Sequence, residues 1–142
     1  MADILYRSND IEARRVAADG SGVRVVTFDC YHDAPGFDRR AFGESFFAGE
    51  GIGAIHVLTR GNDWFQHPDL PEALAAIRAA GDGGPLLAYG SSMGGYAALR
   101  FADAIGATLT ADVTALITLS ARRRAAREAR LDAGARGRGG AL

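Results

Sequence analysis

Short apolar runs, separated by polar and glycine-containing segments, divide the chain into alternating elements. In the first half these runs predict strands at residues 4–6, 11–17, 23–28 and 54–58. The run 23–28 is dense in β-branched residues, which is typical of a strand in the middle of a sheet. The sequence Asp19-Gly20-Ser21-Gly22 lies between two of the runs and predicts a hairpin that joins them.

Three segments between the apolar runs have helical character. Residues 39–49 predict a helix that ends at glycine and has three aromatic residues on one side, Phe42, Phe46 and Phe47. Asp69, with Glu72 three residues later, predicts the start of a second helix, and Leu74 and Ile77 mark its buried face. Residues 93–105 predict a third helix, rich in alanine. The apolar run before this helix and the run 113–119 predict two further strands.

Strands that alternate with helices at these spacings predict an α/β fold. We expect a mostly parallel sheet with an antiparallel N-terminal hairpin and helices on both faces. In such a sheet the loops after the parallel strands share one edge, where ligands bind. The loops expected at this edge begin at Asp29, Thr59, Gly90 and Ser120.

The clearest chemical motif lies where the apolar run before residue 90 meets the predicted helix 93–105. Gly90, Ser92 and Gly94 fill the fixed places of G-x-S-x-G, and Ser91 cannot replace Ser92, because Tyr89 stands two residues before it. A nucleophile on a strained strand-to-helix turn needs neighbours with almost no side chain. The N-terminus of the following helix points its free N–H groups at this serine, so Met93 N–H is the first candidate donor of an oxyanion hole. The chain has no lysine, which excludes a P-loop, and a dinucleotide fingerprint needs glycine where Ser92 stands.

This motif in this context resembles the nucleophile elbow of the α/β-hydrolase superfamily. The resemblance covers about residues 1–120 and implies a partial α/β-hydrolase-like sheet. It implies a serine hydrolase of the esterase or acyl hydrolase type, with Ser92 attacking a small-molecule ester or acyl substrate and with no cofactor or metal. The second oxyanion-hole donor is then the backbone of Cys30 or Tyr31, although Tyr31 is equally open to a packing role at the strand end.

The loop at residues 60–68 follows the predicted strand 54–58 and shares the edge of the sheet with Ser92. It offers four residues that wall or bind a substrate: Asn62, Asp63, Trp64 and His67. In the alternative interpretation, Trp64 and Phe65 cover the helix beneath them and Asp63 caps a turn.

Two partners of the serine are missing from the expected places. In the family an acid and then a histidine follow the nucleophile, whereas His32, His56 and His67 all precede Ser92. His56 lies inside a predicted strand, and use of His32 or His67 as the base would depart from the family's order. The acids that follow the serine are Asp103, Asp112, Glu128 and Asp132. We therefore expect a truncated serine hydrolase without a complete triad.

The balance of charge changes abruptly near residue 120. Residues 1–120 carry nine Arg against fifteen acidic residues, and Arg, Ala and Gly fill 18 of the 22 positions from 121 to 142. We interpret residues 1–120 as the N-terminal part of a hydrolase-like domain and 121–142 as a disordered tail or the product of a shifted reading frame. A basic arm for nucleic acid or an acidic membrane is the alternative, but no nucleic acid is expected on the acidic residues 1–120.

Two other functions stay open: a non-catalytic hydrolase-like binding module, and a flavodoxin-like domain with a phosphate or flavin on the turn at 90–95. The single cysteine excludes an internal disulfide and a multi-cysteine zinc site. No apolar run is long enough to span a membrane and no leader is apparent, so a cytoplasmic protein is expected. The strand 113–119, left at an edge, predicts self-association through that edge.

Overall fold

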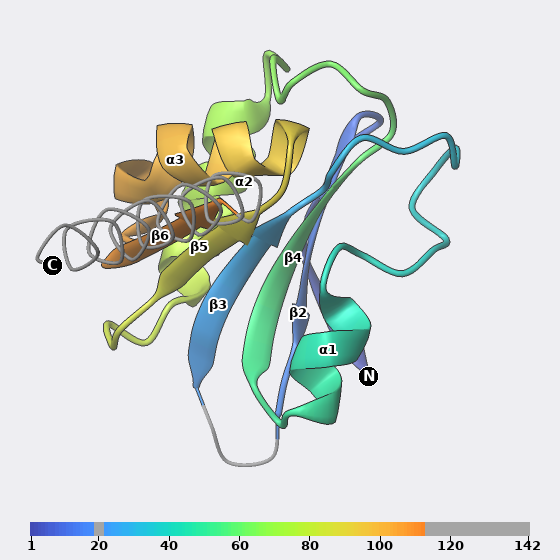
Figure 1. Cartoon of the computed structure of the whole chain (residues 1–142). Coiled ribbons are helices and arrows are strands. Elements are labelled where there is room, and N and C mark those ends of the chain that lie inside the picture. Colours follow the sequence, from blue (N-terminus) through green and yellow to red (C-terminus); the bar gives the residue numbers. More distant parts are fainter. Residues whose placement is uncertain (19–21, 113–142) are drawn as a thin grey trace, which may run out of the picture.

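The computed structural model describes residues 1–18 and 22–112, which form one six-stranded sheet with three helices (Figure 1). The strands are β1 (Ala2–Arg7), β2 (Ile11–Val16), β3 (Val23–Phe28), β4 (Gly53–Thr59), β5 (Leu87–Gly90) and β6 (Leu109–Asp112). The helices are α1 (Glu44–Gly49), α2 (Leu70–Ala80) and α3 (Met93–Ile105). The predicted α/β class is confirmed.

The sheet has the order β1-β2-β4-β3-β5-β6. β2 runs antiparallel to both β1 and β4, whereas β3 is parallel to β4 and β5, and β5 is parallel to β6. The expected sheet, mostly parallel with an antiparallel N-terminal hairpin, is therefore confirmed, and the hairpin is formed by β1 and β2.

The hairpin predicted between residues 11–17 and 23–28 is wrong. β4 lies between β2 and β3 and pairs with both of them, because the connection through α1 returns the chain beside β3 in the parallel direction. β4 is buried along its whole length, which suits this central position. Residues 19–21, where the turn was expected, lie outside the described residues.

The face of the sheet that α2 and α3 cover is apolar. Side chains from β3 and β4, such as Val26, Phe28 and Val57, meet Leu74 and Ile77 of α2 there, and the predicted buried face of α2 is confirmed. α3 approaches the sheet closely because its inner surface consists mostly of small residues: Gly94, Gly95, Ala97 and Ala98 are buried. The predicted bounds of this helix are confirmed.

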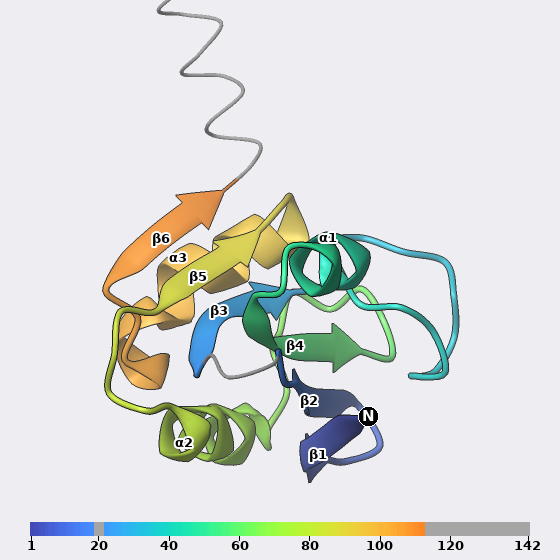
Figure 2. The same cartoon turned by 90° about the horizontal axis from the view of Figure 1, so that it is seen from below.

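α1 lies on the opposite side of the sheet from α2 (Figure 2) and packs on β4 through a small cluster of Val25, Phe47 and Ala54. The helix predicted at 39–49 is too long, since α1 begins only at Glu44. Phe46 is 62% exposed while Phe47 is buried, because neighbouring helical positions cannot share one side.

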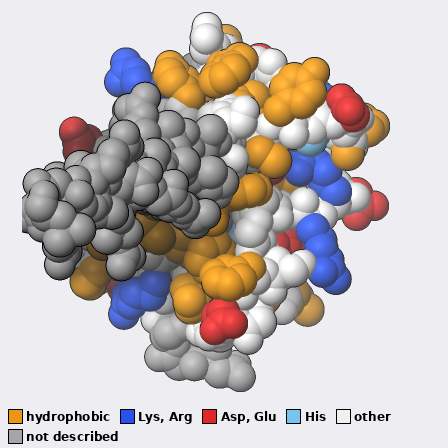
Figure 3. Space-filling view, viewed as in Figure 1, with side chains coloured by type: hydrophobic (Ala, Val, Ile, Leu, Met, Phe, Trp, Pro, Cys, Tyr) orange, Lys and Arg blue, Asp and Glu red, His pale blue; other side chains and the backbone are white. Residues whose placement is uncertain are grey.

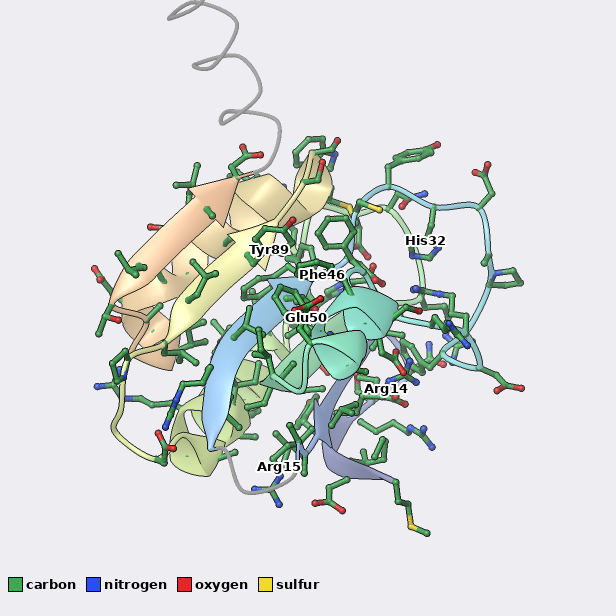
Figure 4. The ribbon with its side chains drawn as sticks, turned by 60° about the horizontal axis from the view of Figure 1, so that its bottom comes forward. Arg14, Arg15, His32, Phe46, Glu50 and Tyr89 are labelled. Carbon is green, nitrogen blue, oxygen red and sulfur yellow. The ribbon has the colours of Figure 1, made fainter. Side chains whose placement is uncertain are left out.

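Buried polar groups complete this second face. Glu12 of β2 is fully buried and forms ion pairs with Arg7 and Arg14. Arg14 also donates to Glu44 at 2.8 Å and to the carbonyl oxygen of Arg39 at 2.5 Å. Figure 4 shows Arg14 and its neighbour Arg15 on opposite sides of β2, as strand geometry requires.

His56 lies in the same polar layer, with its Nδ1 2.6 Å from Thr27 Oγ1. Its side chain is 1% exposed. Burial, the largest influence, lowers the pKa of His56 to about 4. The imidazole is therefore neutral at pH 7, and the interpretation of His56 as a residue inside a strand is confirmed.

α2 begins directly after Asp69, as predicted, but Asp69 makes no side-chain capping hydrogen bond. Its carboxylate instead accepts a hydrogen bond from the Tyr6 hydroxyl at 2.8 Å, which fastens β1 to the start of α2. The described parts of the chain contain no helix with the length and apolar character needed to cross a bilayer. The strand expected at 113–119 and the tail at 121–142 lie outside the described residues, and the strand beside β5 begins already at Leu109.

Candidate functional site

The turn between β5 and α3 holds Ser92 in an unusual backbone conformation. Ser92 has φ 54° and ψ −120°, a region that residues with a side chain rarely adopt and that costs about 1–3 kcal/mol. The first turn of α3 fixes this conformation, because the carbonyl oxygen of Ser91 accepts from Gly94 N–H at 2.9 Å and that of Ser92 from Tyr96 N–H at 3.0 Å. Ser92 itself is exposed.

Two glycines make this tight turn possible. A Cβ atom on Gly90 would overlap the carbonyl group of Gly94 and lie 2.7 Å from the amide nitrogen of Gly95. A Cβ atom on Gly94 would overlap the carbonyl oxygen of Phe28 and lie 2.6 Å from that of Asp29. Because the neighbours are backbone atoms, they cannot rotate away. The expected need for side-chain-free residues on both sides of Ser92 is confirmed.

Three backbone N–H groups lie at the same edge of the sheet. Met93 is the first residue of α3, and Cys30 and Tyr31 follow β3, whose last residue Phe28 is in register with Gly90 of β5. In the part of the chain that the structure describes, none of these three N–H groups donates to a backbone carbonyl oxygen in a turn or loop, and the Cys30 N–H contacts the sulfur of its own side chain. Free N–H groups near the positive end of a helix favour a negatively charged ligand atom.

The side chains of Cys30 and Tyr31 have no evident part in this group of N–H donors. Cys30 is half-buried, and burial raises the pKa of its thiol, so that it is a thiol rather than a thiolate. The Tyr31 side chain is 64% exposed and does not fill the strand end. What the loop after β3 contributes at this edge is its backbone.

A buried ion pair holds the first residue of that loop. Asp29 is 2% exposed, and both of its carboxylate oxygens accept from the Arg39 guanidinium, at 3.2 and 2.5 Å. The same carboxylate accepts the backbone N–H of Thr59, the last residue of β4, at 2.9 Å. Arginine side chains gather beside the loop that leads from β3 to α1 (Figure 3).

Asn62 holds the other end of the loop. Its Oδ1 accepts His32 N–H at 3.0 Å, and its Nδ2 donates to the His32 carbonyl oxygen at 2.5 Å. Asn62 was expected to wall or bind a substrate, but both ends of its amide are hydrogen-bonded to the backbone of His32. The imidazole of His32, which Figure 4 labels, lies 3.1 Å from the carbonyl oxygen of Thr59.

The remaining predicted residues of the loop 60–68 form a strained aromatic turn. Trp64 and Phe65 have φ 58° and 59°. Phe65 is buried with its ring edge-to-face on Phe28. Trp64 is 44% exposed and rests edge-to-face on Tyr96, in the first half of α3. Of the two side chains expected to cover a helix, Trp64 lies on a residue of α3, whereas Phe65 lies on a residue of β3.

Each of the three histidines lies against another polar group. His32 lies against Arg39 and Thr59, His56 against Thr27, and the Nε2 of His67 lies 2.8 Å from Asp63 Oδ1. The carboxylate of Asp63 therefore faces His67 rather than capping a turn.

One acid lies next to the elbow and was not among the predicted site residues. Asp112 is in register with Gly90, and a Cβ atom on Gly95 would overlap its carboxyl group, 2.7 Å from Oδ2. The sequence pattern missed this position because the last strand was expected at 113–119, which put Asp112 before the strand instead of inside it. The signal available was the spacing: Leu109 follows the glycine that ends α3 by three residues.

One cavity of the described residues lies away from this edge. A cavity of about 300 Å³ is lined by residues such as Arg78, Gly83 and Thr108, at the opposite ends of the strands. Within 1–18 and 22–112, no three His, Cys, Asp or Glu side chains are grouped in a way that would hold a metal ion.

Comparison with known proteins found no matching family model, no similar curated protein and no similar solved structure. The function therefore has to be argued from the geometry of the site itself.

Proposed function

We propose that this protein is a serine hydrolase of the esterase or acyl hydrolase type, with Ser92 as its nucleophile and a small-molecule ester or acyl compound as its substrate. The conformation of Ser92, with φ 54° and ψ −120° on an exposed strand-to-helix turn, is the observation that carries this proposal. Strained backbone of this kind persists only where surrounding structure enforces it, and it concentrates at functional sites. In a G-x-S-x-G motif, a strained turn of this kind exposes the serine hydroxyl at the end of a strand, where it can act as a nucleophile.

In the proposed reaction, Ser92 Oγ attacks the carbonyl carbon of the substrate, and the carbonyl oxygen of the substrate gains a negative charge. Met93 N–H, together with the N–H of Cys30 or Tyr31, donates hydrogen bonds to that oxygen. Collapse of the intermediate expels the alcohol or amine, which takes up the proton that the serine hydroxyl lost, and water then cleaves the serine ester to give the acid and restore the hydroxyl.

A serine hydroxyl also needs a base that takes its proton. The three histidines of the chain are held by other groups. Asp112, beside the first turn of α3, is the described acid that lies nearest to this turn in the sheet register.

The experiment that tests the proposal is covalent labelling with a fluorophosphonate. Ser92 Oγ would form a bond to phosphorus as the P–F bond breaks, fluoride leaves, and the hydroxyl proton passes to solvent. Intact-mass analysis and peptide mapping should place one adduct on Ser92. Ser92→Ala should abolish the adduct, while the neighbouring Ser91→Ala should keep it. A folded wild-type protein that forms no adduct, or an adduct that survives Ser92→Ala, would contradict the proposal and leave the binding-module function.

A second test concerns the strain itself. Ser92→Ala and Ser92→Gly both remove the hydroxyl, but only glycine removes the Cβ atom from a backbone with φ 54°. We expect the glycine variant to be more stable than the alanine variant by about 1 kcal/mol in chemical denaturation. Equal stability of the two variants would show that the turn holds Ser92 without strain.

A further inference from the structure

The loop of residues 29–32, between β3 and the segment that leads to α1, is fastened at both ends and open in the middle. Asp29 and His32 make side-chain or backbone hydrogen bonds to β4 and the loop after it. Between them, the N–H groups of Cys30 and Tyr31 donate to no backbone carbonyl oxygen within the described residues, and the Cys30 N–H contacts only the weak acceptor sulfur of its own side chain there. A segment held in this way can present its central N–H groups in one fixed place.

The first fastening point is buried and charge-assisted. The planar guanidinium of Arg39 donates to both oxygens of Asp29, which is the strongest arrangement for such a pair. Thr59 N–H adds a third hydrogen bond to the same carboxylate, so that Asp29 connects the ends of β3 and β4. The carbonyl oxygen of Asp29 lies close to the elbow, only 2.6 Å from the place that a Cβ atom on Gly94 would take.

At the second fastening point, the Asn62 side chain forms the pair of hydrogen bonds that a residue of a neighbouring strand would form. Asn62 binds the N–H and the C=O of the same residue, His32, through its own C=O and NH₂ groups. One side chain thus fixes both the position and the orientation of the His32 backbone. The loop after β3 is thereby tied to the loop after β4.

We propose that Asn62 and the Asp29–Arg39 pair are positioning residues. They hold the backbone N–H groups of Cys30 and Tyr31 at the place where the substrate oxygen becomes an oxyanion when Ser92 attacks. This inference rests on the proposed serine chemistry. It gives Asn62 a different role from the predicted contact with substrate: its removal slows the covalent step without weakening the binding of the reagent. Removal of one oxyanion-hole donor lowers catalytic rates about 100- to 1000-fold, and a misplaced donor costs less.

The test is the rate of labelling by the same fluorophosphonate, whose P=O oxygen occupies the place of the oxyanion. The maximal rate of inactivation, kinact, and the reagent's half-saturating concentration, KI, are measured separately. For Asn62→Ala we expect kinact to fall about 10- to 100-fold, with KI within about twofold of wild type. Asn62→Asp keeps the acceptor for His32 N–H and loses the donor, so its kinact should lie between those of the alanine variant and wild type.

Asn9→Ala is the matched control, because Asn9 lies on the exposed turn between β1 and β2 and its side chain makes only a 3.4 Å contact with Asp10. Its kinact should equal that of wild type. Arg39→Lys keeps the charge but lacks the planar pair of N–H donors that matches the two oxygens of Asp29, and it gives an independent variant should Asn62→Ala not fold. Its kinact should also fall at unchanged KI.

The outcomes separate this inference from the proposed function. A wild-type protein that forms no Ser92 adduct overturns both. A wild-type protein that forms the adduct, with kinact unchanged in folded Asn62→Ala or Arg39→Lys protein, overturns the positioning role alone. A fall in kinact that the control does not share supports it.

Discussion

The two faces of the central strands are stabilised by different physical means. Toward α2 and α3, β3 and β4 present Val26, Phe28, Ile55 and Val57 to an apolar core. Toward α1, the alternate positions of the same region carry Thr27, His56, Glu12 and Arg14. Apolar burial depends mainly on the area removed from water and tolerates changes that conserve volume. A buried polar layer depends on complete pairing, since removal of one group leaves its partners buried and unpaired.

The comparison predicts the largest effect for Arg14→Met. This side chain is 13% exposed and binds Glu12, Glu44 and the carbonyl oxygens of Phe37 and Arg39. Its loss leaves fully buried Glu12 without one of its two partners, and we expect the free energy of unfolding to fall by about 3–5 kcal/mol. Urea denaturation measures this difference.

The next residue provides the matched control. Arg15 is paired with Asp3, and the two side chains are 38% and 61% exposed. Arg15→Met should change stability by less than about 1 kcal/mol. If the two arginine variants were equally stable, the polar layer would not act as a unit.

Gly94→Ala tests whether the apolar face tolerates an added methyl group at its closest backbone contact. The new methyl group would meet the carbonyl oxygens of Phe28 and Asp29, and neither strand nor helix can yield locally. We expect a loss of about 3 kcal/mol in the free energy of unfolding. Gly61→Ala is the control, because a Cβ atom there has nothing within 4 Å. Equal stability of the two alanine variants would contradict the close contact between α3 and the end of β3.

The contribution of His56 to the pH dependence of stability should report on the polar face. The pKa of His56 is about 4 in the folded protein and about 6.5 in an unfolded chain. Between these values the unfolded state binds the proton more readily, so stability falls as pH falls from 6.5 toward 4. We expect His56 to contribute a loss of about 2 kcal/mol between pH 7 and pH 5.

The measurement is the difference between wild type and His56→Gln in urea denaturation at the two pH values, since carboxylates shared by both proteins cancel. The wild type should lose about 2 kcal/mol more than the variant. Parallel curves for the two proteins would show that His56 is not buried in its neutral form.

Sequence patterns predicted the elements that depend on local information. The helix at 93–105 and the glycines around Ser92 follow from spacing within a dozen residues. The place of β4 between β2 and β3 did not follow, because strand order depends on the path of the chain through α1. The hydrogen bonds of Asn62 and the place of Asp112 beside the elbow did not follow either, since each depends on a partner far away in the sequence: the backbone of His32 for Asn62 and Gly95 for Asp112.

The strand order also governs how the chain can assemble as it is synthesised. β3 pairs only with β4 and β5 among the described strands, and both follow it in the chain, the second ending at Gly90. β1 and β2 can form their hairpin as soon as they emerge, whereas the apolar residues of β3 have to wait for partners. Unpaired apolar strands are prone to wrong association. The interval between the emergence of Phe28 and that of Gly90 is therefore the period in which a growing chain is most vulnerable to aggregation.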